Sequence, residues 1–525
     1  MTGFIDVLLR GALLVAAAFA VGGVAWARLV LRAEPHAKPA AAVARCLRAA
    51  SLGGWLAATA QGAIVLLVLA DVSGNAGHVP LGDYLGTSFA RTAIVRAMLG
   101  AALAVLAGRM AGRAAGGAAW GLLTVLALAT SASSAGLSHA AARVDGRLLL
   151  LGLDAAHQLA ASVWVGGLAH FTLHVARTRG EDDPYRRVLA PRFSTVALVA
   201  MSTMVATGLA LTLLYVGDLA GMVGTAYGVM ILSKVALLAA VLGLAAVNFR
   251  LVRRAFGAEP PARLTRFVEV ELGLGITILF AAASLTSLPP ATDVRADRAT
   301  PAEVAGRFVP APPRLTSPPI ADLIRTAEPL MAPPGERLAV ERAWSEYNHH
   351  WAGFFVLTMG LLAVLERTGV RAARHWPLVF LGLAAFLFIR NDPRAWPLGP
   401  AGFWESMALP DVLQHRAFVV LIVVFGIFEW MVRVGRLPAR PWALVFPLLC
   451  AAGGGMLLTH SHAMFNLKDE FLTEVTHAPL GIAGAFAGWA RWVEVRLPEA
   501  GGTPAWLWRA CLVTVGVILL VYREA

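Results

Sequence analysis

The chain has 525 residues, of which 58% are hydrophobic and only 14% are charged, and its mean hydropathy is +0.68. An ordinary soluble domain carries roughly 25% charged residues, so this composition excludes a water-soluble fold. The formal net charge of +12 does not indicate a nucleic-acid partner, because the Arg and Lys residues lie in short loops and form no basic patch with interleaved aromatic residues.

Apolar runs that are long enough to cross about 30 Å of hydrocarbon recur along the chain. Eight of them fill the first part of the sequence, at residues 4–31, 46–71, 91–109, 117–139, 148–176, 193–215, 227–249 and 267–288. Six more follow, at residues 350–365, 376–389, 412–432, 442–460, 476–492 and 506–522. The sequence therefore predicts an all-α, polytopic integral membrane helical bundle of about fourteen transmembrane helices, eight plus six.

A stretch rich in proline separates the two sets of spans. It contains the pairs Pro312-Pro313, Pro318-Pro319 and Pro333-Pro334, which cannot continue a helix or a sheet ladder. We therefore predict three parts: an eight-helix membrane domain at residues 1–290, a Pro-rich periplasmic linker at 291–345, and a six-helix membrane domain at 346–525.

The loops between the spans alternate in charge, and this alternation predicts the orientation of the chain. Positively charged loops lie at residues 28–48, 109–113, 177–192, 250–266, 367–374, 433–440 and 491–496. The intervening loops, such as 72–90 and 217–226, hold almost no Lys or Arg. The positive-inside rule then places the basic loops in the cytoplasm, and an even number of spans places both termini outside, in the periplasm of a bacterial inner membrane.

Cysteine is too scarce for disulfides or for sites built on paired thiols. Cys46, Cys450 and Cys511 are isolated, which excludes a disulfide framework, a CxxC thiol site and a CxxCH haem attachment. Any metal site must therefore use His, Met and carboxylates. The sequence also lacks GxSxG, HExxH and P-loop motifs, so we do not expect an enzyme, and a metalloreductase is the alternative.

Several histidines fall at the predicted outer ends of the C-terminal spans, at one membrane depth. Imidazole together with thioether or carboxylate suits copper or another late transition metal. We therefore predict an outer metal-capture site, with Glu474 in support, from His349, His350, His415, His460, His462, Met464 and His477. The alternative is that these residues only decorate helix ends at the membrane interface.

A second set of residues lies within the N-terminal spans, where polar side chains are costly and often functional. Met201 and Met204 share one helix face, and two soft sulfurs there suit Cu(I), although Met is also an ordinary core residue. We predict an intramembrane metal route from these two residues with His139 and His157, and we expect Asp154 to orient His157. Lys234 either neutralises such a carboxylate or lines a permeation path.

The spacing of histidines in the fifth predicted span also suggests haem binding as an alternative hypothesis. His157 and His170 are thirteen residues apart, about 20 Å along a helix, which resembles the spacing of two stacked haems. Bis-His ligation needs opposing histidines, and no neighbouring span has one at the depth of His170. One haem b, in an electron carrier or metalloreductase, stays open as the alternative.

The N-terminal part resembles the CopD family, the inner-membrane component of bacterial copper-resistance systems, over roughly residues 1–290. The resemblance rests on an ordered series of motifs: Thr87-Ser88-Phe89-Ala90-Arg91, Arg96, Asp154-Ala155-Ala156-His157, Trp164-Val165-Gly166-Gly167, Arg192-Phe193-Ser194, Thr207-Gly208, Ala226-Tyr227-Gly228, Lys234, Asn248-Phe249-Arg250, Glu271 and Leu288-Pro289-Pro290. The C-terminal set of spans departs from the known fused versions of the family.

This resemblance implies a helical membrane protein that moves copper from periplasm to cytoplasm or passes it to partner proteins. We therefore expect copper transport or copper resistance, with copper and membrane lipid as ligands and a periplasmic copper chaperone as a partner. The outer histidines would capture the ion for the N-terminal domain. Delivery of copper for oxidase assembly is a further alternative.

Overall fold

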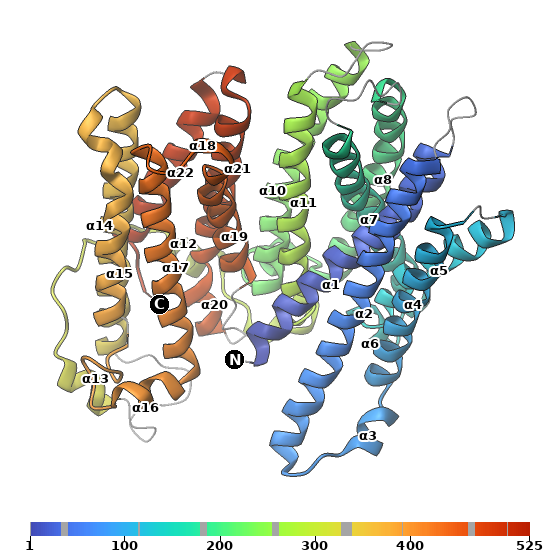
Figure 1. The fold of residues 1–525 in the computed structure, drawn as a ribbon. Coiled ribbons are helices and arrows are strands. Elements are labelled where there is room, and N and C mark those ends of the chain that lie inside the picture. The colour runs from blue at the N-terminus through green and yellow to red at the C-terminus, as the bar shows by residue number, and fades with distance from the viewer. Residues whose placement is uncertain are drawn as a thin grey trace. The chain divides into compact units, whose positions relative to one another are not determined.

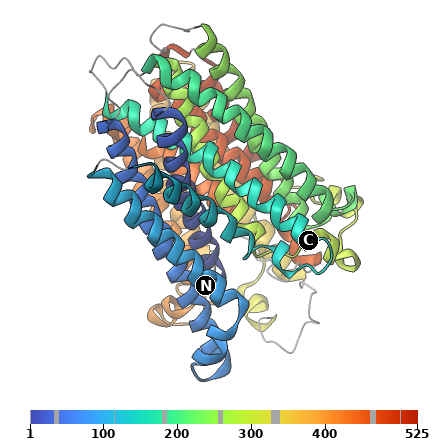
Figure 2. The same cartoon turned by 90° about the vertical axis from the view of Figure 1, so that its right-hand side faces the viewer.

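The computed structural model describes residues 2–32, 40–113, 116–178, 186–254, 262–326, 339–390, 392–459, 468–500 and 502–524. These residues form helices joined by short turns, and no β-strand occurs among them. Long helices dominate both halves of the chain, as the ribbon shows in two orientations (Figures 1 and 2). The prediction of an all-α, polytopic membrane protein is confirmed.

Among the described residues, twelve helices are long and apolar enough to cross a membrane by length and composition. They include all eight of the predicted N-terminal spans and four of the six C-terminal ones. The other two predicted spans correspond to α19 (Val445–Thr459), a shorter apolar helix, and α21 (His477–Arg496), whose last turns carry Arg491 and Glu494. Charged residues at that end shorten the apolar part of α21.

The first of two compact units, here the N-terminal unit, comprises Thr2–Asp218 and Lys234–Asp293. Its elements are α1 (Thr2–Ala25), η1 (Trp26–Leu31), α2 (Ala40–Ala76), α3 (Leu81–Gly86), α4 (Ser88–Ala111), α5 (Gly117–Ala135), α6 (His139–Ala142), α7 (Arg147–Arg177), α8 (Arg186–Tyr215), the larger part of α10 (Ala226–Arg254), α11 (Ala262–Leu285) and η2 (Ala291–Asp293). In Figure 1 they are coloured blue to green.

Helix α1 is the centre of packing in the N-terminal unit, where it contacts α2, α5, α7 and α11. Its approach to α7 depends on small residues, because a Cβ built at Gly166 would lie 2.0 Å from the Ala18 carbonyl oxygen. Membrane helices associate largely through such close backbone packing, since lipid provides no hydrophobic drive between them. The glycine therefore sets how closely α7, with His157 and His170, lies against α1.

The second compact unit, here the C-terminal unit, comprises Leu219–Ser233 and the described part of Val294–Ala525. Besides α19 and α21, it holds α9 (Leu219–Val223), the first turns of α10, η3 (Arg295–Asp297), α12 (Pro301–Arg307), α13 (Ile320–Thr326), α14 (Ala339–Arg367), η4 (Arg371–Leu378), α15 (Val379–Arg390), α16 (Phe403–Ala408), α17 (Pro410–Arg433), α18 (Ala439–Trp442), α20 (Lys468–Glu474), η5 (Pro498–Ala500) and α22 (Gly502–Leu520). The described residues 291–326 of the predicted Pro-rich segment thus contain short helices between extended stretches, and residues 339–345 belong to α14.

The C-terminal unit has an aromatic core around Trp376, Phe446 and Trp508. Beside this core, three arginines and three glutamates from four helices form a chain of ion pairs: Glu366 with Arg433, Arg433 with Glu429, Glu429 with Arg491, Arg491 with Glu494, and Glu494 with Arg509. Their charges cancel, which is what burial at a helix-packing interface requires. The network fastens α14, α17, α21 and α22 at one end.

At another place in the C-terminal unit, α20 is tied to α12. Lys468 Nζ lies 2.6 Å from Glu303 Oε1, and Val304 packs against Phe471 in a small apolar cluster. The hydrogen bond from Lys468, followed by those from Thr300, lowers the pKa of Glu303 to about 2. The pair therefore stays ionised at any physiological pH and holds α20, which leads into α21, in place.

Candidate functional site

Two of the predicted metal-binding histidines meet in the C-terminal unit. His349 lies in α14, and His477 is the first residue of α21. Their ring centroids are 6.0 Å apart, and the ring planes are inclined by 69°. On its other face, the His349 ring stacks on Tyr522 with a centroid separation of 4.0 Å. Imidazoles that are 128 positions apart in the sequence thus come together, as the prediction of an outer site requires.

The hydrogen bonds of these two rings resemble those of metal-binding histidines. His349 Nδ1 donates to the Ser345 carbonyl oxygen at 2.8 Å, and His477 Nδ1 donates to the Glu474 carbonyl oxygen at 3.2 Å. Because a carbonyl can only accept, each Nδ1 carries the proton, and the lone pair belongs to Nε2. A ligating histidine typically donates its other ring nitrogen to a carbonyl in this way. Glu474, predicted as a supporting residue, thus contributes its backbone.

Three residues that the sequence analysis did not select lie beside His349. Ser345 Oγ and the Tyr522 hydroxyl both donate to the Glu524 carboxylate, and Glu524 is only 5% exposed. Ser345 Oγ is also 3.3 Å from His349 Nδ1. A buried carboxylate is thereby connected to the histidine through one hydroxyl. This connection could not be predicted from the sequence, because Tyr522 and Glu524 simply follow the last apolar helix.

His350, the neighbour of His349, has a different environment. Its ring is completely buried, Nδ1 accepts the Arg314 N–H at 2.6 Å, and Nε2 donates to the Tyr522 carbonyl oxygen at 2.8 Å. Both nitrogens through which imidazole binds a metal are therefore engaged by backbone groups. The ring joins the extended stretch before α13 to the residues that follow α22.

His415, in α17, contacts Asp392 with Nδ1 at 3.2 Å from Oδ2. It is thus placed beside a carboxylate, while the His349 and His477 rings face each other. The predicted ligands His460, His462 and Met464 lie outside the described residues, between α19 and α20. Among the residues that the structure does describe, no group of three or more His, Cys, Asp or Glu is placed to hold a metal ion.

In the N-terminal unit, His157 of α7 faces α8. Its Nδ1 donates to the Met204 carbonyl oxygen at 3.0 Å and lies 3.1 Å from Thr207 Oγ1, so Nε2 again carries the lone pair. Met201 and Met204 are 8% and 6% exposed, on the same helix. His157 and Met204 are therefore neighbours at the interface of α7 and α8, and Met201 lies one turn before Met204 on α8.

The other two residues of the predicted N-terminal set have separate partners. His139 Nε2 donates to the Leu285 carbonyl oxygen at 3.0 Å, at the start of α6. Asp154 accepts a hydrogen bond from Gln158 Nε2 at 3.0 Å. The ring of His157 is thus oriented by Met204 and Thr207 of α8, and the carboxylate expected to orient it bonds within its own helix.

A further histidine contact links α1, α2 and α7. His170 Nε2 donates to the Phe19 carbonyl oxygen at 3.0 Å, its Nδ1 is 3.4 Å from Cys46 Sγ, and its ring stacks on Phe19. Both ring nitrogens are engaged, so this ring is not placed to ligate a haem. The sequence contained Cys46 and His170 only as isolated residues in different spans.

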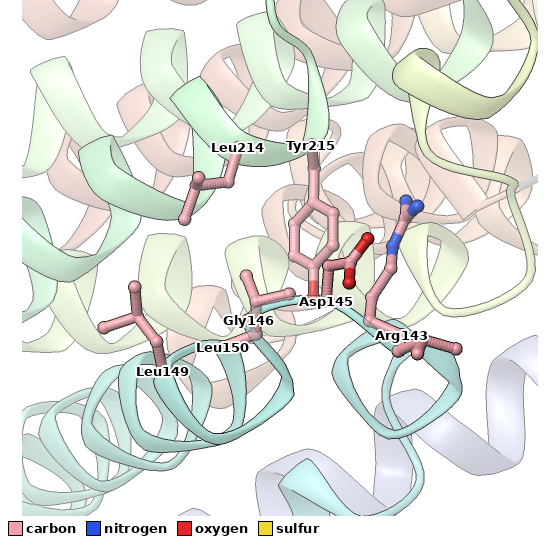
Figure 3. A pocket seen from close by; sticks show the side chains of 8 residues that line it. Arg143, Asp145, Gly146, Leu149, Leu150, Leu214 and Tyr215 are labelled. Atoms are coloured by element: carbon pink, nitrogen blue, oxygen red, sulfur yellow. The ribbon is translucent and has the colours of Figure 1, made fainter.

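A pocket of about 310 Å³ opens at the start of α7 (Figure 3). Tyr215 extends from α8 toward Asp145 and Gly146, and the Arg143 guanidinium lies 5.6 Å from the Tyr215 ring centroid. Arg143 also pairs with Asp293 at 2.8 Å. None of the residues that line the pocket belongs to the predicted metal set, so the pocket and the histidine pair are separate features.

Comparison with known proteins gives two partial matches. Residues 187–285 match the family described as CopD, copper resistance protein D. Copper transport protein CutJ of Bacillus subtilis (strain 168) is 31% identical over 150 residues, which are 28% of this chain and 27% of CutJ. The chain thus spans about a quarter of that relative's length. No solved structure matches the chain. The resemblance to the CopD family is confirmed, with the match covering α8 except for its first residue, and all of α9, α10 and α11.

Proposed function

We propose that this chain, a multi-pass helical membrane protein with a CopD-family segment, binds copper and takes part in copper transport or copper resistance. The observation that carries the proposal is the meeting of His349 and His477, whose ring centroids are 6.0 Å apart. Their Nδ1 atoms each donate to a backbone carbonyl, so in each ring the lone pair, through which imidazole binds a metal, is on Nε2.

Copper fits this pair better than a hard cation does. Imidazole nitrogen binds Cu, Zn, Ni and Fe, whereas Mg²⁺ and Ca²⁺ prefer oxygen ligands. The similarity to CopD and CutJ favours copper among these metals. Tyr522 packs against His349 and limits its movement, so the imidazole is held ready for the ion. The proposed role is binding and transfer of the ion, without a chemical transformation.

The N-terminal unit supplies a second candidate position on the proposed route. His157, Met201 and Met204 combine one imidazole and two thioethers at the interface of α7 and α8. Thioethers favour Cu(I), which binds soft sulfur. Both methionines lie within the CopD-matched residues, whereas His157 lies 30 residues before the first of them. We propose that this group holds copper within a bacterial inner membrane. The pair of His349 and His477 would lie at the outer side of that membrane.

The proposal is tested by copper titration of the purified protein in detergent, in competition with a chromophoric chelator. In a His157→Ala background, which removes the imidazole of the second proposed position, we expect the double variant His349→Ala/His477→Ala to bind copper at least about 100-fold more weakly. Loss of an outer-sphere partner alone costs about 10- to 100-fold in affinity, and loss of two ligands should cost no less.

The matched control is His78→Ala, because His78 is exposed in a loop and, among the described residues, bonds to the Ala76 carbonyl two positions away. This control should bind copper as the parent protein does. Equal copper stoichiometry and affinity in the double variant and the parent would refute the proposed site.

A further inference from the structure

Within the N-terminal unit, a set of polar residues from several helices, here called the polar layer, lies inside otherwise apolar spans. The layer consists of Arg10 (α1), Gln61 (α2), Arg96 (α4), Ser131 (α5), Asp154 (α7) and Lys234 (α10). The metal-binding proposal uses none of these side chains as a ligand. Polar and ionisable groups inside a membrane are costly and usually have a function.

The helix register brings three of these residues to the same height. Gly54 of α2 packs on Gly100 and Ala104 of α4, and the two helices run antiparallel. Gln61, seven residues after Gly54, is therefore level with Arg96. On the other side of α4, Gly136 of α5 packs on Thr92, which makes Ser131 level with Arg96 as well.

The charges of the layer do not cancel among the described residues. Arg10 pairs with Asp6 at 2.6 Å. Asp154 lies within electrostatic range of both Arg96 and Lys234, but among the described residues it forms no ion pair with either and accepts a hydrogen bond from Gln158. Arg96 also lies within range of the like charge of Arg10. The layer together with Asp6 thus contains three cations, Arg10, Arg96 and Lys234, but two carboxylates, Asp6 and Asp154. Among the described residues, Arg96 has no direct counterion.

The buried polar atoms around Arg96 lack partners in the part of the chain that the structure describes. Arg96 is 8% exposed, and its Nε and Nη2 are fully buried without a hydrogen-bond acceptor. Gln61 Oε1 and Ser131 Oγ are buried and unpartnered too, with side chains 1% and 5% exposed. A buried guanidinium without hydrogen-bond acceptors is strongly unfavourable, so a ligand that accepts hydrogen bonds from Arg96 would stabilise the folded protein.

We propose that Arg96, Gln61 and Ser131 form an intramembrane binding site for a small inorganic anion such as chloride. Arg96 donates from Nε and Nη2, the Ser131 hydroxyl donates, and the Gln61 amide donates once its oxygen and nitrogen are exchanged by a flip. The anion supplies the negative charge that the layer lacks. A metal cation is excluded from this place by the guanidinium, so the site is distinct from the copper positions and its existence does not depend on them.

The experiment is thermal unfolding of the purified full chain in detergent, with chloride replacing gluconate at constant ionic strength. A ligand that binds only the folded state raises the unfolding temperature in a saturable way. We expect the parent protein to gain about 2 °C or more at saturation, and Arg96→Gln to lose the response. Arg91→Gln, an exposed arginine on the same helix, should keep it.

If Arg96→Gln does not fold, Gln61→Leu provides a second variant, with a side chain of similar volume. We expect Gln61→Leu to require at least about 10-fold more chloride than the parent protein for half of the maximal rise in unfolding temperature. Crystals soaked in bromide should then give an anomalous peak within hydrogen-bonding distance of Arg96. Absence of a saturable chloride effect in the parent protein, or an equal effect in Arg96→Gln, would overturn the proposal. Copper titration of the same variants separates this result from the copper proposal, because copper affinity at His349 and His477 should be unchanged.

Discussion

His349 and His350 illustrate how adjacent residues in one helix acquire different roles. Successive side chains on a helix are separated by about 100°, so the two rings face different neighbours. His349 turns toward His477 and Tyr522, whereas His350 is enclosed by Arg314 and the Tyr522 backbone. The sequence placed both at the same helix end and could not distinguish them, because the segments that enclose His350 come from elsewhere in the chain.

At the residue scale we predict that His350→Ala lowers stability without removing copper binding. The substitution leaves the buried Arg314 N–H and the Tyr522 carbonyl unpaired, and we expect a loss of about 2–4 kcal/mol. Chemical denaturation in detergent measures this loss, and His78→Ala should change stability by less than about 0.5 kcal/mol. A variant as stable as the parent but unable to bind copper would show that His350 is a ligand after all.

The helices themselves follow from the apolar runs of the sequence, but their contacts do not. Runs of apolar residues predicted α1, α4 and α5 to within a few residues, because the membrane imposes a minimum apolar length. Which helices touch depends on small residues and polar pairs, for which a single sequence offers little. The contact of His170 with Cys46 and the ion-pair chain around Arg433 are of this kind, since each joins residues of different spans.

At the element scale we predict that Gly166→Ala destabilises the contact between α1 and α7. The new methyl group would lie 2.0 Å from the Ala18 carbonyl oxygen, so the helices must separate, at a cost of about 1–3 kcal/mol. Gly152→Ala, on the same helix with no atom within 4 Å, should be neutral or stabilising by up to about 1 kcal/mol. Equal unfolding temperatures for the two variants would contradict this packing account.

On the scale of the whole molecule, the distribution of charge in the loops determines the expected orientation. The loop around Val79 holds no Lys or Arg, whereas Arg109 and Arg113 flank the turn between α4 and α5. The positive-inside rule therefore puts Val79 outside and Arg113 in the cytoplasm. In the proposed function, orientation sets the side from which copper would reach His349 and His477. Figure 1 shows the helices without a membrane, so this assignment comes from the sequence.

We predict that a cysteine placed at position 79 reacts with a membrane-impermeant maleimide in intact cells, and that one at position 113 reacts only after permeabilisation. Both side chains are exposed, so accessibility is limited by the membrane alone. Cys46, Cys450 and Cys511 are replaced first, to provide a silent background. Labelling of position 113 but not of 79 in intact cells would reverse the orientation and place the histidine pair inside.

The central claim is that copper is held by imidazoles from α14 and α21. X-ray absorption spectroscopy at the copper edge of the purified, copper-loaded protein tests it most directly, because imidazole rings give a characteristic multiple-scattering pattern. We expect histidine nitrogen ligands in the parent protein, and weaker imidazole scattering in His349→Ala/His477→Ala, in which His157 is the one imidazole of the two proposed positions that remains. Copper surrounded by sulfur alone, or an unchanged spectrum in the double variant, would contradict it.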